Sequence, residues 1–269
     1  MSARRDSVLR EMGLGPLWRL RSRDASAVVE ARPAIEEAGG TGPAPAVRPP
    51  IPGLPAREAE LRPEAPAGMP LDEGRLNRIA HLDWDALEAD ISACRNCPLC
   101  EGRQRAVPGM GDRKARVMFV GEGPGAEEDR QGLPFVGAAG RLLDAMLGSI
   151  GLSRESGVYI ANTVKCRPPR NRTPEPAEMA ACQPYLARQI ELVRPSLLVA
   201  LGRPAAQVLL NAPDVRINAA RGRMFSREGT PVMVTYHPAY LLRNPLDKAR
   251  TWEDLCAIRR QLSENGGEG

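Results

Sequence analysis

The chain has 269 residues, with 37 Lys or Arg against 33 Asp or Glu and a net charge of +4. This length suits one large domain or two small ones, and the small basic excess permits nucleic-acid binding without arguing for it. The amino terminus has arginines but no apolar stretch of a signal peptide, and no apolar run is long enough to span a bilayer. We therefore expect a cytoplasmic protein with no membrane partner. Six cysteines are too few for a disulfide scaffold in a chain of this size and favour metal binding.

Residues 1–75 are predicted to form a largely disordered extension. Proline is frequent between Thr41 and Pro70 and alternates with Ala, Gly, Arg and Glu. Such a segment cannot bury enough apolar area to offset its chain entropy. Before it, apolar residues and arginines between Leu9 and Arg21 predict a short helix. This helix is either a solvated one or a docking element for an unidentified protein partner.

Residues 82–264 are predicted to form one α/β domain. Asp83 is expected to cap a helix that runs through Ile91. Continuous apolar runs at 116–121, 158–164, 196–202 and 231–236 predict buried strands, and helical patterns cover 138–150, 176–193, 204–210 and 246–263. This alternation predicts a three-layer αβα architecture with a central four-stranded, mainly parallel sheet. Its site is expected at the carboxyl ends of the strands.

The first of these strand ends carries a glycine-rich loop. Its sequence, Gly121-Glu-Gly-Pro-Gly125-Ala, matches the dinucleotide pattern G-x-G-x-x-G/A on its face. Pro124 removes an amide from a phosphate nest, however, and Glu122 would repel a pyrophosphate. The loop is better suited to present a carboxylate on a tight turn beside a small polar ligand.

Three further residues are candidates for the site. His237 follows the last predicted strand directly, although a lone histidine is often structural. Asn162 ends the second strand, where an amide can both donate to and accept from the edge of a nucleobase. Phe135 lies in the loop Gly132-Leu-Pro-Phe-Val-Gly137 and is either a planar stacking partner or a hydrophobic plug.

Basic and apolar side chains near the strand ends could contact DNA. Arg170 and Arg172 belong to a group of arginines that would track a phosphate backbone if they lie on one side of the sheet. The segment with Leu241, Leu242 and Arg243 suits an apolar wedge that enters a base stack. Its alternative interpretation is the first turn of the closing helix.

The cysteines form a spaced set. Cys94 and Cys97 have metal-binding spacing, whereas Cys166 and Cys182 are too far apart to form the second knuckle of a zinc ribbon. A cuboidal iron–sulfur cluster tolerates such scattered thiolates better than a zinc ion does. The remaining alternative is that these cysteines are buried and pack as small hydrophobic residues.

Six segments occur in a fixed order between residue 94 and about residue 260. They are Cys94-Arg-Asn-Cys97-Pro-Leu, Gly121-Glu-Gly-Pro-Gly125, Leu133-Pro-Phe-Val-Gly137, Asn162-Thr-Val-Lys-Cys-Arg-Pro-Pro169, Cys182-Gln-Pro-Tyr-Leu186 and His237-Pro-Ala-Tyr-Leu-Leu-Arg-Asn-Pro245. Each is weak alone, but the ordered set is specific. It resembles the family 4 uracil-DNA glycosylases, the iron–sulfur branch of their superfamily.

The resemblance implies a monomeric DNA repair enzyme that flips uracil out of single- or double-stranded DNA and hydrolyses its N-glycosidic bond. It also implies site residues and a 4Fe-4S cluster. The implied catalytic residues are Glu122, Asn162 and His237; the substrate contacts are Gly121, Gly123, Phe135 and Asn162; the DNA contacts are Leu241, Leu242, Arg243, Arg170 and Arg172; and the cluster ligands are Cys94, Cys97, Cys166 and Cys182.

Three other functions fit part of the pattern. One is a nucleic-acid-binding protein with a zinc or iron–sulfur site and no catalysis. Another is a redox protein whose cluster transfers electrons. The third is a glycosylase for a different deaminated or oxidised base.

Overall fold

The computed structural model describes residues 72–264. The predicted extension, including its short helix, lies outside the described residues except for its last few positions. The boundaries between extension and domain therefore stay a prediction. Within the described residues, no helix is both long enough and apolar enough to cross a membrane.

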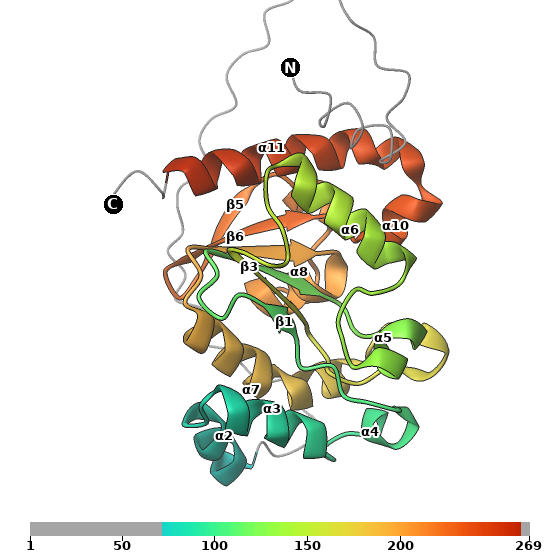
Figure 1. Cartoon of the computed structure of the whole chain (residues 1–269), viewed down its shortest axis with the longest axis vertical. Coiled ribbons are helices and arrows are strands. Elements are labelled where there is room, and N and C mark those ends of the chain that lie inside the picture. Colours follow the sequence, from blue (N-terminus) through green and yellow to red (C-terminus); the bar gives the residue numbers. More distant parts are fainter. Residues whose placement is uncertain (1–71, 265–269) are drawn as a thin grey trace, which may run out of the picture. The chain divides into compact units, whose positions relative to one another are not determined.

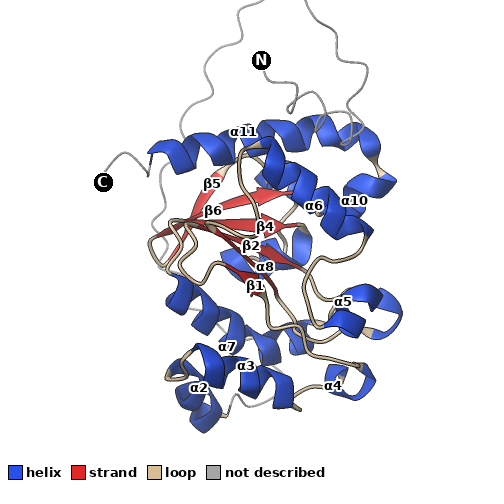
Figure 2. Ribbon diagram, viewed as in Figure 1, coloured by secondary structure: helices blue, strands red, loops and turns tan. Residues whose placement is uncertain are grey.

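A six-stranded sheet with the order β1-β3-β2-β4-β6-β5 forms the centre (Figure 2). Its strands are β1 (Met110–Gly111), β2 (Val117–Gly121), β3 (Val158–Asn162), β4 (Leu197–Leu201), β5 (Met224–Arg227) and β6 (Thr230–Thr235). The four predicted strands are β2, β3, β4 and β6, and they are parallel to one another. The predicted strand number is wrong, because β1 and β5 add antiparallel edges. Neither edge strand carries the continuous apolar run by which a doubly covered strand is recognised.

Helices cover both faces of the sheet, so the predicted three-layer αβα architecture is confirmed (Figures 1 and 2). On one face lie α6 (Ala138–Ser149), α10 (Pro238–Arg243) and α11 (Lys248–Glu264). On the other lie α7 (Pro176–Val193) and α8 (Arg203–Leu210). The segment 239–245 is therefore mostly a helix of its own, α10, which the short turn η2 (Pro245–Asp247) separates from the closing helix.

The central strands bury side chains on both faces. In β2, Val117 and Phe119 pack into the core beneath α6 and α11, whereas Met118 and Val120 pack into the core beside α7 and α8. Successive side chains of a strand point to opposite faces, so a strand covered on both faces must have apolar residues at every position. This double burial explains why the strands were predictable from apolar runs.

Within residues 72–264, three helices precede the sheet: α2 (Glu73–Ala80), α3 (Trp84–Ala93) and α4 (Leu99–Gly102). The helix α3 starts at its predicted cap, because the carboxylate of Asp83 accepts the Ala86 N–H at 2.9 Å. A third apolar cluster joins these helices to α7 through residues such as Ile79, Leu87 and Cys182. The remaining short elements are α5 (Ala126–Gln131), α9 (Ile217–Ala220) and η1 (Pro169–Asn171).

Candidate active site and cysteine cluster

The carboxyl ends of the parallel strands meet at one edge of the sheet. Gly121 pairs with Asn162 where β2 and β3 end, and the Gly202 N–H donates to the Thr235 carbonyl at 2.9 Å where β4 and β6 end. A groove runs along this edge. Its lining includes Glu122, Gly123, Phe135, Asn162, Gly202 and His237. The four predicted strand ends thus converge on one site.

Phe135 lies over the end of β2 and beside His237. Their ring centroids are 5.5 Å apart, with the ring planes tilted by 31°. A Cβ atom on Gly121 would lie 2.6 Å from Cζ of Phe135 and 2.5 Å from Oδ1 of Asn162. Any side chain at Gly121 would displace both groups, so glycine is a steric requirement of this pocket.

Asn162 presents an unpaired acceptor. Its side chain is 2% exposed, and its Oδ1 has no hydrogen-bond partner within the described residues. A buried polar atom without a partner costs about 1–3 kcal/mol, so the pocket favours a ligand that donates a hydrogen bond there. The backbone carbonyl of Asn162 is paired, since it accepts from Nζ of the buried Lys165 at 2.8 Å.

His237 is a neutral imidazole with a defined tautomer. Its Nδ1 accepts the Ala239 N–H at 3.1 Å, which caps α10. The ring proton therefore belongs on Nε2. Burial lowers the pKa of His237 from 6.5 to about 4, and the positive charge of Arg243 acts in the same direction. At neutral pH the side chain is thus an uncharged donor.

Glu122 supplies the carboxyl group of the groove. Burial raises its pKa, while a hydrogen bond with Thr173 and the charge of Arg243 oppose that rise. The Glu122 carbonyl accepts from the Val164 N–H at 3.3 Å and from the hydroxyl of Thr163. These two hydrogen bonds join the loop after β2 to the loop after β3. They therefore fix the backbone position from which the Glu122 side chain extends.

Glu128 is a site residue that the sequence interpretation missed. Its Oε2 accepts the Gly125 N–H at 3.1 Å, and its Oε1 accepts the N–H groups of Val136 and Gly137 at 2.9 and 3.0 Å. It thereby joins the glycine-rich loop to the loop that carries Phe135. A glutamate three residues after the cap of a helix is the available sequence signal.

The two leucines predicted to contact DNA differ in their exposure. Leu241 is fully buried in the core, whereas the neighbouring Leu242 is 45% exposed. Consecutive residues point to different sides of a helix, and α10 packs one side against the core. Of these two leucines, Leu242 is the one that presents its side chain at the surface.

The predicted arginines differ in their pairing. Arg243 is exposed and lines the groove, and Arg170 is exposed at a backbone φ of +53°. Arg172 instead donates to both carboxylate oxygens of the largely buried Glu178, at 2.8 and 2.6 Å. A phosphate would have to compete with this bidentate pair, so Arg172 is the least available of the three.

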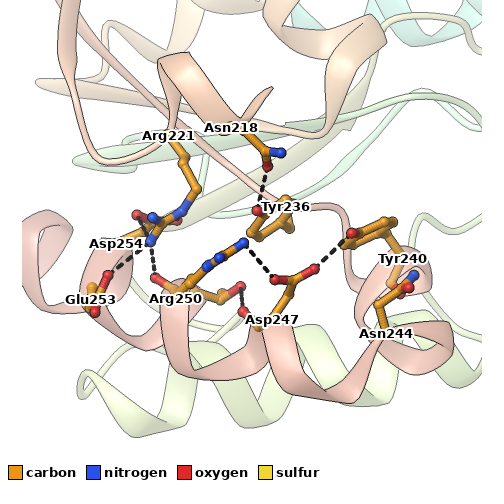
Figure 3. Close-up of polar contacts among 10 residues, drawn as sticks. Asn218, Arg221, Tyr236, Tyr240, Asn244, Asp247, Arg250, Glu253 and Asp254 are labelled. Carbon is orange, nitrogen blue, oxygen red and sulfur yellow. Dashed lines mark hydrogen bonds and ion pairs between the residues drawn. The ribbon is translucent and has the colours of Figure 1, made fainter. Parts of the chain in front are cut away.

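A polar network fixes α10 and the strand end before it (Figure 3). The hydroxyl of Tyr236 donates to Oδ1 of Asn218 at 2.6 Å, and its ring stacks on Tyr240 with centroids 5.0 Å apart. The hydroxyl of Tyr240 donates to Asp247 at 2.7 Å, and Asp247 also pairs with Arg250 at 3.1 Å. These contacts hold the rim of the groove to α9 and α11.

Five cysteines surround a small cavity away from the groove. They are Cys94, Cys97, Cys100, Cys166 and Cys182, and none is in a disulfide. Cys256 lies on α11 and is not part of this lining. The four predicted ligands are therefore brought together, with Cys100 as a fifth thiol beside them.

The environment of these thiols is mostly apolar. Burial raises the pKa of Cys97 to about 11 and that of Cys182 to about 12. Burial also raises the pKa of Cys166, although Arg103 donates to its Sγ at 2.8 Å. Thiolates there need a positively charged group to stabilise them. In residues 72–264, no three His, Cys, Asp or Glu side chains converge closely enough to hold a single metal ion.

One family model matches residues 108–256, and its description is the uracil DNA glycosylase superfamily. The chain is 47% identical over 168 residues to a type-4 uracil-DNA glycosylase of Archaeoglobus fulgidus. The matched region spans 60% of this chain and 84% of that protein. The chain is 47% identical over 179 residues to the type-4 enzyme of Thermotoga maritima, covering 65% and 93%. A type-5 uracil-DNA glycosylase of Thermus thermophilus is 36% identical over 160 residues, covering 48% and 73%. The chain belongs to the type-4 uracil-DNA glycosylases of the uracil DNA glycosylase superfamily.

Proposed function

We propose that this protein removes uracil from DNA by flipping the nucleotide into the groove and hydrolysing its N-glycosidic bond, which leaves an abasic site. The observation that carries the proposal is the buried, unpaired Oδ1 of Asn162 beside the neutral imidazole of His237. A base inside a duplex is inaccessible to these groups, so it must leave the stack before reaction. The names of the type-4 relatives support uracil as the substrate base.

Asn162 selects the base in this proposal. Its unpaired Oδ1 accepts the N3–H of uracil, and its amide NH₂ donates to O4. Cytosine has an acceptor at N3 and a donor at C4, so both contacts would be lost. Each unsatisfied group costs about 1–3 kcal/mol, which is enough for strong discrimination. Phe135 contributes a ring face on which the planar base stacks.

His237 and Glu122 act on the reacting bond. When the C1′–N1 bond breaks, its electron pair remains on uracil and negative charge develops at O2. The Nε2–H of His237 donates to O2 and stabilises that charge without a proton transfer, since the imidazole is neutral. The carboxylate of Glu122 stabilises the cationic sugar or orients the water that adds to C1′.

We assign the DNA contacts to those predicted residues whose side chains are exposed. Leu242 enters the base stack, while Arg243 and Arg170 neutralise phosphates. We propose that the enzyme works as a monomer in the cytoplasm. The amino-terminal segment as a docking element for another protein stays a prediction, because it lies outside the described residues.

We propose a 4Fe-4S cluster held by Cys94, Cys97, Cys166 and Cys182. Thiolate donors around an apolar cavity suit an iron–sulfur cluster, and the spread of the thiols suits a group larger than one ion. When bound, the cluster supplies cross-links between α3, the segment after β3, and α7. The chain's own residues then hold the groove in shape.

The test is an oligonucleotide with a single uracil, incubated with the purified protein in excess EDTA and assayed for abasic sites by alkaline cleavage. We expect cleavage at uracil and none at cytosine or thymine in the same position. A folded, brown protein that leaves uracil in place would overturn the proposal. Release of hypoxanthine or xanthine instead would assign a different base, and a colourless protein with bound zinc would contradict the cluster.

A further inference from the structure

The backbone of Phe135 is strained. Its φ is +53°, in the left-handed region that non-glycine residues rarely occupy. Such a conformation persists only where surrounding contacts outweigh its cost. The question is therefore which residues hold the loop that carries the Phe135 ring.

Arg154 supplies the contacts on one side of this loop. It lies between α6 and β3, and its side chain is 16% exposed. Its guanidinium donates to the carbonyls of Pro134, Phe135 and Gly140 at 3.0, 2.5 and 3.3 Å, and it also pairs with Asp144. One planar group thus binds two successive loop carbonyls and the first turn of α6.

Glu128 and Gly140 hold the other side of the loop. Glu128 accepts the N–H groups of Val136 and Gly137, as described above. A Cβ atom on Gly140 would lie 1.8 Å from the Phe135 carbonyl oxygen, so only glycine lets α6 approach this close. Arg154 thus binds the carbonyls of Pro134 and Phe135, whereas Glu128 binds the N–H groups of the two residues that follow Phe135.

We propose that Arg154 is a positioning residue for base binding, which acts by holding Phe135 in the strained backbone conformation that directs its ring over Gly121 and Asn162. This inference rests on the proposed function, because it takes Phe135 as the stacking partner of the flipped base. Arg154 itself is not among the residues that line the groove. Its effect must therefore pass through Phe135.

A double-mutant cycle tests this route. Single-turnover kinetics over a range of enzyme concentrations separate the binding constant from the rate of bond cleavage. Since stacking contributes equally before and during the reaction, Arg154→Met should weaken binding of uracil-containing DNA about tenfold while the cleavage rate changes less than about twofold. Phe135→Ala should weaken binding at least as much, and the double variant should bind no worse than Phe135→Ala alone.

Arg154→Lys and Arg141→Met complete the series. Lysine keeps the charge but cannot bind three carbonyls in one plane, so an intermediate loss of binding is expected. Arg141 lies on the exposed side of the same helix, α6, and its replacement should leave binding unchanged. Additive losses in the double variant would overturn the proposal, and so would a fall in cleavage rate without a loss of binding.

A measurement without substrate separates this inference from the proposed function. Amide hydrogen exchange in residues 132–140 should accelerate in Arg154→Met, whereas exchange in α7 should stay as in the unmodified protein. Faster exchange throughout the sheet would mean a general loss of stability and would contradict a positioning role. If the unmodified protein released no uracil, the proposed function would fail while the exchange result still decided whether Arg154 holds the loop.

Discussion

The groove and the cysteine cavity are both lined by residues from the end of β3 and the segment that follows it. They differ in the environment that they give to their buried polar groups. In the groove, the side-chain oxygen of Asn162 has no partner among residues 72–264, and the partly buried His237 is neutral. In the cavity, the thiol of Cys182 lies in a mostly apolar cluster, and burial raises its pKa although the charge of Lys165 opposes that rise. In the proposed function, the substrate pairs with the acceptor of Asn162 when it binds, whereas the proposed cluster is needed for the protein to fold. Substitutions should therefore affect catalysis in one region and stability in the other.

The largest effect is expected from Cys182→Ala, which should abolish cluster binding and most of the folded protein. Cys182 lies on α7 and is buried in the third apolar cluster with Cys166, so removal of its thiolate would break a cross-link of the proposed cluster. Iron content, visible absorbance and the thermal midpoint would report the loss. Cys256→Ala on α11 is the control and should retain all three values. A stable, iron-loaded Cys182→Ala protein would show that this thiol is not a ligand.

Next in size is His237→Gln, which should lower the rate of uracil release about 10²–10³-fold, the usual loss for a preorganised donor. The cluster and the thermal midpoint should be nearly unchanged, in contrast to Cys182→Ala. His81, the other histidine of the chain, lies in the turn between α2 and α3 and provides the matched control His81→Gln. If His237→Gln bleached the protein while the rate per folded molecule was preserved, the division between the two regions would be wrong.

A smaller effect should appear in the pH dependence of stability. The pKa of His237 falls from 6.5 to about 4 on folding, so its contribution is complete above pH 6.5 and is lost as the pH falls towards 4. Between pH 7.5 and pH 5 this amounts to about 2 kcal/mol of unfolding free energy. Urea denaturation at both pH values gives the change in unfolding free energy for the unmodified protein and for His237→Gln. The difference between these two changes is the contribution of His237. Equal pH dependence in the two proteins would show that folding does not lower the pKa of His237.

The smallest effect is expected from Leu242→Ala. A half-exposed leucine that inserts partly into a base stack contributes on the order of 1 kcal/mol, or about fivefold in rate. The loss should be confined to duplex substrate, because single-stranded uracil needs no wedge. Comparison of uracil release from duplex and single strands of the same sequence measures it. An equal loss on both would place Leu242 in general DNA binding rather than in base extrusion.

Much of the fold, and the meeting of Glu122, Asn162 and His237 at one groove, were predictable because the signals were local. A strand covered on both faces must be apolar throughout, so β2, β3, β4 and β6 were recognised, and the residues at their ends followed from the topology. The cysteine positions were predictable from their spacing and family pattern. The edge strands β1 and β5 were not, since a strand with one neighbour needs no continuous apolar sequence.

The residues that support the site were harder to predict. Glu128 and Arg154 act through backbone groups of a loop that lies elsewhere in the sequence, and such contacts leave no periodic pattern. Leu241 and Leu242 look alike in sequence, and only the packing of α10 distinguishes them. Local patterns identified side chains that line the groove, whereas tertiary packing determined which residues hold them in place.

The short segment from Asn162 to Cys166 also limits how the protein can be engineered. Thr163, Val164 and Lys165 separate the groove-lining amide of Asn162 from a proposed cluster ligand, so an inserted or deleted residue would move both sites at once. Loop exchange there should fail even where side-chain substitutions succeed. The turn at Glu228 and Gly229 is the better attachment point, because it joins β5 to the amino end of β6, away from the groove. A label or surface tether placed there would leave the DNA-facing edge free.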